Sequence, residues 1–90
     1  MVNVYFNDDH IKMTGHAENP IVCAMVSSLT TLLGNAVLDY LNEDAEVKLD
    51  SGDFYLSKEH LSDEAKLLTD VFEYGILGLA EDYPNSFNIL

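Results

Sequence analysis

His16 and the chain's only cysteine, Cys23, lie seven positions apart in a sequence of 90 residues. A thiol attacks a carbonyl carbon as its thiolate, and a helix N-terminus or a nearby imidazole favours that form. Asn19 is a good N-cap residue and Pro20 suits the first helical position, so Cys23 is expected in the first turns of a helix. This spacing would allow nucleophilic catalysis by Cys23, with His16 as the general base.

Both residues also have ordinary explanations. A lone cysteine between two apolar residues is commonly a small core side chain, and His16 could be an unpaired surface histidine. A third group that orients the imidazole is not identifiable from the sequence. Glu18 is too close along the chain, and Asp50 or Asp53 would need the fold to bring them near.

Four residues around the pair are candidates for substrate binding. Gly15 could supply a turn or a close approach of the backbone to a bound peptide. Ser27 lies one helical turn beyond Cys23 on the same face, where packing is the alternative role. The four candidates are Gly15, Ala17, Asn19 and Ser27.

The sequence contains no motif for a metal, phosphate or dinucleotide site. His10, His16, His60 and Cys23 lack the spacing of zinc ligands. The chain has neither a phosphate-binding loop nor a dinucleotide fingerprint. We therefore expect no metal and no cofactor.

Alternating apolar and polar residues predict two β-hairpins. Residues 2–6 and 11–14 flank a polar turn. Residues 45–50 and 53–57 flank Ser51-Gly52, which is typical of a two-residue hairpin turn. The hairpins should form one sheet with a covered face.

Two helices and a last strand complete the pattern. The first helix should run from about Pro20 to Leu41, and its wide apolar surface predicts a mostly buried helix with one face available to a second subunit. The second helix should begin after Ser62 and stop at Tyr83-Pro84, before a strand at 86–90. Helix glycines indicate tight packing. They are Gly34, Gly75 and Gly78.

The element order ββαββα(β) predicts an α+β fold. We expect a two-layer sandwich in which two helices pack on an antiparallel sheet. The sequence contains no repeat and no linker, so residues 1–90 should form a single domain. A chain of this length can bury one hydrophobic core without a metal or a disulfide.

Sixteen carboxylates against four lysines give a net charge of −12. This charge argues against binding to nucleic acid or to an anionic membrane surface. The carboxylates either form a solvated surface or attract a basic protein partner. No uninterrupted apolar run reaches the length of a membrane span, and the N-terminus does not read as a signal peptide. A single cysteine suits a reducing interior, so we expect a cytoplasmic protein.

The segment around Cys23 resembles the ribosomal-processing cysteine proteases, the Prp or YsxB-like family. The matching residues are Gly15-His16-Ala17, followed by Ile21-Val22-Cys23-Ala24 at the start of a long helix. The order of elements agrees along nearly the whole chain. One departure is clear: the family usually has more residues between the histidine and the cysteine. Here the loop is shorter, and Pro20 stands where the family commonly has an aspartate.

The resemblance implies a cysteine endopeptidase with Cys23 as the nucleophile and His16 as the base. Members of that family remove an N-terminal extension from a large-subunit ribosomal protein, and related phage proteins would act on capsid or scaffold precursors. The resemblance also implies a homodimer and a protein substrate, for which the charge suggests a basic segment. The shortened loop leaves an alternative hypothesis, a non-catalytic binding or assembly module with the same fold.

Overall fold

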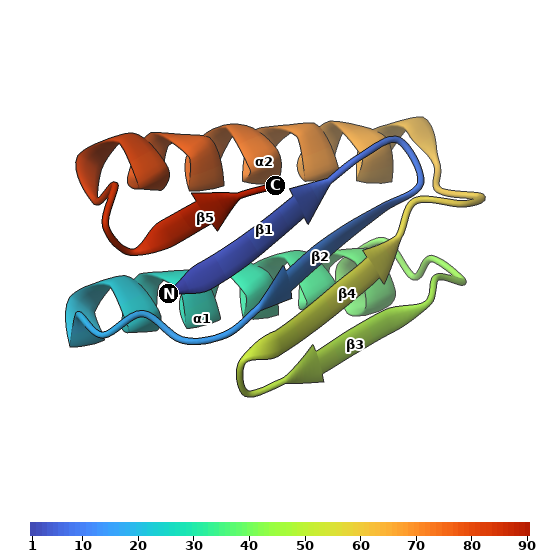
Figure 1. Ribbon diagram of the computed structural model, residues 1–90. Coiled ribbons are helices and arrows are strands. Elements are labelled where there is room, and N and C mark those ends of the chain that lie inside the picture. The colour runs from blue at the N-terminus through green and yellow to red at the C-terminus, as the bar shows by residue number, and fades with distance from the viewer.

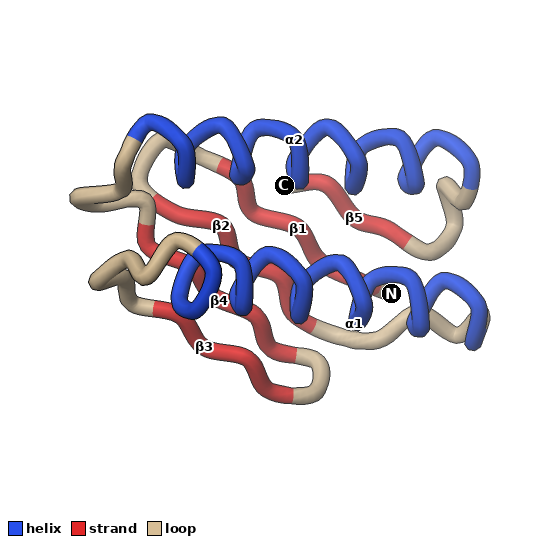
Figure 2. The backbone as a smooth tube through the Cα atoms, turned by 180° about the vertical axis from the view of Figure 1, so that it is seen from behind, coloured by secondary structure: helices blue, strands red, loops and turns tan.

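Two helices cover one face of a five-stranded sheet (Figure 1). The computed structural model describes all residues from Met1 to Leu90. Seen from behind, both helices lie in front of the sheet (Figure 2), which confirms the predicted α+β sandwich. The elements are β1 (Val2–Phe6), β2 (His10–Thr14), α1 (Pro20–Asn35), a π-helical turn (Ala36–Tyr40), β3 (Val47–Asp50), β4 (Asp53–Ser57), α2 (Asp63–Asp82) and β5 (Phe87–Ile89). The spatial strand order is β3-β4-β2-β1-β5.

The sheet is mixed because its last strand is parallel to its first. β1 with β2, β2 with β4, and β3 with β4 pair antiparallel, as predicted. β5 instead pairs parallel with β1, with Val2 opposite Phe87. The antiparallel prediction therefore fails for this one pair. The reason is that α2 carries the chain back along the sheet before β5 begins, as a crossover connection does.

The turn between β3 and β4 has the predicted two-residue form. Asp50 pairs with Asp53, so only Ser51 and Gly52 form the loop. Gly52 has a φ of +72°, the left-handed conformation that such tight hairpin turns require. The turn sequence thus determined the register of this hairpin.

Helix α1 starts as predicted and continues through the π-helical turn to Tyr40. The side chain of Asn19 accepts a hydrogen bond of 2.9 Å from the backbone N–H of Ile21, and Pro20 occupies the first helical position. The expectation of a mostly buried helix is wrong. Ile21, Leu32 and Tyr40 are 63%, 66% and 86% exposed, because a helix on the outside of a two-layer sandwich buries only one face.

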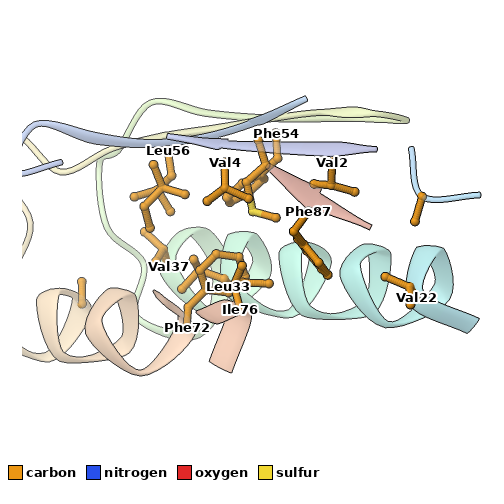
Figure 3. Close-up of a cluster of buried hydrophobic side chains, with 14 of the residues drawn as sticks. Val2, Val4, Val22, Leu33, Val37, Phe54, Leu56, Phe72, Ile76 and Phe87 are labelled. Carbon is orange, nitrogen blue, oxygen red and sulfur yellow. The ribbon is translucent and has the colours of Figure 1, made fainter. Parts of the chain in front are cut away.

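The helical stretch Pro20–Tyr40 has 21 residues and a mean hydropathy of 1.9, so by length and composition alone it could cross a membrane. The expectation concerned uninterrupted apolar runs, and serine, threonine, glycine and asparagine residues do interrupt this stretch. The core helix of a soluble protein passes the same test, and here Val22, Leu33 and Val37 belong to the core cluster beneath the sheet (Figure 3).

The core lies between the helices and the covered face of the sheet. Figure 3 shows Val4 and Leu56 of the strands facing Phe72 and Ile76 of α2. Alternate strand residues supply this layer, as a half-covered sheet requires. Not every apolar residue of α2 joins this layer, since Val71 is 59% exposed.

The three helix glycines differ in their surroundings. A Cβ at Gly34 would lie 2.7 Å from Cδ1 of Leu49, so the predicted close approach of α1 to a neighbour is confirmed. Around Gly75 and Gly78 a Cβ would meet nothing within 4 Å. The predicted tight packing at these two glycines of α2 is therefore wrong.

Candidate active site

His16 and Cys23 line the same cavity, which has a volume of about 250 Å³. One wall is the N-terminal half of α1. The other wall is the hairpin of β3 and β4, whose turn lies at the same end of the sheet as the link from β2 to α1 (Figure 1). The fold thus brings a thiol and an imidazole from adjacent segments into one concave site.

Cys23 is a free, partly exposed cysteine in the first turns of α1. Its backbone N–H donates a hydrogen bond of 3.0 Å to the carbonyl of Asn19, the first regular bond of the helix. Pro20 has no N–H, and the N–H of Ile21 is taken by the Asn19 side chain. Val22 therefore carries the one N–H of this turn that has no partner within the chain. The positive end of the helix dipole lies near the sulfur.

His16 is exposed and follows Gly15 in the link between β2 and α1. Its carbonyl accepts a hydrogen bond of 2.6 Å from the N-terminal amino group of Met1. The Nε2 side of its imidazole lies against Gly52 of the hairpin turn. No hydrogen bond joins the sulfur of Cys23 to either ring nitrogen of His16. Catalytic hydrogen bonds are often loose before substrate binds.

Three of the four predicted substrate-binding residues line the cavity, namely Gly15, Ala17 and Ser27. Gly15 has a φ of +91°, and the Cβ of any other residue would fall on the carbonyl oxygen of Met1. The close approach that was predicted at Gly15 is therefore made to Met1 of the same chain. Ala17 is buried, whereas Ser27 is exposed at the cavity wall. Asn19 does not line the cavity, because its side chain caps α1.

The hairpin wall was not predicted as part of the site. It contributes residues 49–54, and α1 adds Thr30 and Thr31. The Ser51-Gly52 turn signal located the hairpin in the sequence, but only the sheet order brings it beside α1. Asp50 and Asp53 reach the cavity in this way.

The carboxylate charge beside the cavity is partly balanced by Lys48. Its Nζ lies 2.8 Å from Oδ2 of Asp53 and 3.9 Å from Oδ2 of Asp50. The hydrogen bond with Asp53, aided by the charge attraction, raises the pKa of Lys48 above its usual value. The structure contains no group of three His, Cys, Asp or Glu side chains that could hold a metal ion.

A sequence comparison identifies the family. The family model for cysteine protease Prp matches residues 1–88. None of the curated proteins matches the chain.

Solved structures with the same fold are known. The chain is similar to the essential ribosomal processing protease Prp from S. aureus in complex with a covalently linked product peptide, with 25% identity, a TM-score of 0.81, and 98% of this chain and 94% of that chain covered. It is similar to SMU.848 from Streptococcus mutans at 26% identity and a TM-score of 0.83, covering 99% and 95% of the two chains. The S. aureus protease with a substrate peptide shares the fold at 24% identity and a TM-score of 0.80, covering 99% and 95%.

Proposed function

This chain belongs to the Prp family of cysteine proteases, and from that premise we propose that it is an endopeptidase in which Cys23 attacks the scissile bond and His16 transfers the protons. The observation that carries this proposal is that both side chains line one cavity of about 250 Å³. The S. aureus relative is described with a covalently linked product peptide, which suits a reaction through a covalent enzyme intermediate.

In the first half of the proposed reaction, His16 removes the proton of the Cys23 thiol. The thiolate adds to the carbonyl carbon of the scissile peptide bond, and the tetrahedral intermediate collapses with cleavage of the C–N bond. The proton on His16 passes to the leaving amine, so the products are a free amine and a thioester on Cys23.

In the second half, water attacks the thioester carbonyl carbon. His16 accepts a proton from the water and returns it to the sulfur as the C–S bond breaks, which releases a carboxylic acid and restores the thiol. The helix dipole at the start of α1 favours the thiolate as a leaving group. No metal or organic cofactor takes part in these steps.

We propose that the substrate is the precursor of a basic protein, either a ribosomal protein with an N-terminal extension or a phage structural protein. A net charge of −12 would attract a Lys- or Arg-rich segment and speed its association. Asp50 and Asp53 would extend this negative field to the cavity itself.

A second copy of the chain is the partner that we propose for the exposed face of α1. From Pro20 to Leu38 the helix has no charged residue, although the chain as a whole is strongly acidic. Ile21 and Leu32 are exposed on this face, and two such faces could meet without bringing carboxylates together. We expect Leu32→Asp to convert a dimer into a monomer in sedimentation, whereas Leu67→Asp on α2 should not.

The cleavage test uses a recombinant ribosomal protein precursor that carries its N-terminal extension. Wild-type protein should release the extension, detected by mass spectrometry of both products. Cys23→Ala should abolish cleavage, and His16→Ala should slow it by on the order of 10²-fold. Ser28→Ala, which changes the same helix outside the cavity, is the matched control. If wild type and Cys23→Ala both bind the precursor and neither cuts it, the chain is the alternative, a binding module.

A further inference from the structure

The turn of the β3–β4 hairpin is hydrogen-bonded to the residue that follows β2. The backbone N–H of Gly15 donates a hydrogen bond of 2.9 Å to the carbonyl of Gly52. This bond extends the pairing of the two strands one step beyond Thr14 and Asp53. The backbone of Gly52 is therefore held in position and cannot easily move away from the residue that follows Gly15.

That next residue is His16, and its ring occupies the space where a side chain at position 52 would be. A Cβ on Gly52 would be closest to Nε2 of the imidazole and would lie 2.9 Å from Cε1 and 3.0 Å from Cδ2. Real Cβ atoms essentially never approach another heavy atom closer than 3.0 Å. The His16 ring therefore cannot keep its present position if residue 52 carries a side chain.

A hydrogen bond also holds the backbone of His16 in position. A side chain at position 52 would therefore move the His16 imidazole and not the His16 backbone. Its carbonyl accepts the hydrogen bond of 2.6 Å from Met1. The imidazole, in contrast, is the exposed end of a side chain with two rotatable bonds, and it can swing away at little cost to the fold. A substitution at Gly52 should therefore displace the ring rather than unfold the hairpin.

We propose that Gly52 is a positioning residue for His16: its missing side chain lets the imidazole rest against the hairpin turn at the wall of the cavity that Cys23 lines. This inference depends on the proposed role of His16 as the base. It goes further by assigning a part of the reaction to the β3–β4 hairpin, which is distant in sequence from both His16 and Cys23.

A turn requirement alone would also select glycine here, since φ is +72°. The test must separate the two reasons. Asparagine tolerates a positive φ better than other side chains, yet it carries a Cβ. Gly52→Asn therefore preserves the turn while filling the space beneath the imidazole. Thermal unfolding followed by circular dichroism would show that the variant remains folded.

The main experiment measures the rate at which iodoacetamide alkylates Cys23 at neutral pH in four proteins: wild type, His16→Ala, Gly52→Asn and the double variant. We expect Gly52→Asn to slow alkylation by the same factor as His16→Ala. In the double variant no further slowing should occur, because there is no longer a ring to displace. NMR of ¹³C-labelled histidine should show a shifted His16 ring signal in Gly52→Asn, with His10 and His60 as unchanged internal references.

The outcomes distinguish two failures. If His16→Ala does not slow alkylation, the proposed pairing of His16 with Cys23 is wrong, and the role of Gly52 is overturned with it. If His16→Ala slows alkylation but Gly52→Asn leaves the rate and the His16 signal unchanged, only the positioning role is overturned. The same conclusion follows if the two substitutions slow alkylation by independent factors in the double variant.

Discussion

Leu49 of β3 packs against Gly34 of α1 so closely that a Cβ at position 34 would lie 2.7 Å from Cδ1 of Leu49. Leu49 also lines the cavity that contains Cys23. This one contact joins an edge strand of the sheet to the helix that carries the nucleophile. It therefore sets how far apart the two walls of the candidate active site can lie.

The contact predicts a small effect of Gly34→Ala on stability. Alanine favours a helix by about 1 kcal/mol over glycine, but the new methyl group must displace the end of the Leu49 side chain, which costs a comparable amount. We expect the free energy of unfolding in urea to change by less than about 1 kcal/mol. A loss of several kcal/mol would mean that β3 cannot adjust to the helix.

Gly75→Ala and Gly78→Ala should stabilise the protein. Both glycines lie in α2, and a Cβ there would meet nothing within 4 Å. Each substitution should raise the free energy of unfolding by about 0.5–1 kcal/mol through helix propensity. Urea titrations of the two variants measure this directly. Destabilisation by either variant would contradict the open surroundings of that glycine.

Lys58→Met should lower stability by about 1–3 kcal/mol, because it leaves polar partners without their hydrogen bonds. The Nζ of Lys58 donates to Oε2 of Glu73 at 2.8 Å and to the carbonyl of Asn7 at 2.6 Å. The side chains of Lys58 and Glu73 are only 14% and 19% exposed, so water replaces these bonds poorly. Lys66→Met, on the exposed side of α2, is the control and should change the unfolding free energy by less than about 0.5 kcal/mol.

The hydrogen bond that Glu43 accepts at the start of α2 leads us to expect that the protein loses stability at acidic pH. Oε1 of Glu43 accepts a hydrogen bond of 2.7 Å from the backbone N–H of Ser62, the N-cap of α2. This bond, together with one from the Ser62 side chain, lowers the pKa of Glu43 below its usual value. A lowered pKa stabilises the folded state above the pKa of the unfolded chain, and the stabilisation disappears as the pH falls through the folded-state pKa.

The measurement compares wild type with Glu43→Gln in urea titrations from neutral pH down to about pH 3, a range that spans the ordinary pKa of a glutamate. Wild type should be the more stable protein near neutrality, and the difference should shrink as Glu43 becomes protonated. Glu81→Gln, at the exposed end of α2, is the control. A difference that stays constant over the whole range would refute the role of the carboxylate at this cap.

The sequence by itself determined most of the local structure, because the signals that end elements act over a few residues. Asn19 and Pro20 determined the start of α1, Ser62 that of α2, and Ser51-Gly52 the register of a hairpin. These are short-range effects of capping and turn geometry, which do not need the rest of the fold. That His16 and Cys23 line one cavity could be expected from the sequence for the same reason, since a short loop joins them.

The tertiary structure decided what lies next to these elements. The sheet order brings Gly52 under the His16 imidazole and places Asp50 and Asp53 at the cavity, across more than thirty residues of sequence. It also decided that α1 buries only one face, although its composition suggested more. Strand order and helix packing depend on contacts between distant segments, whose free energies are shared over the whole core and leave no signal at any single position.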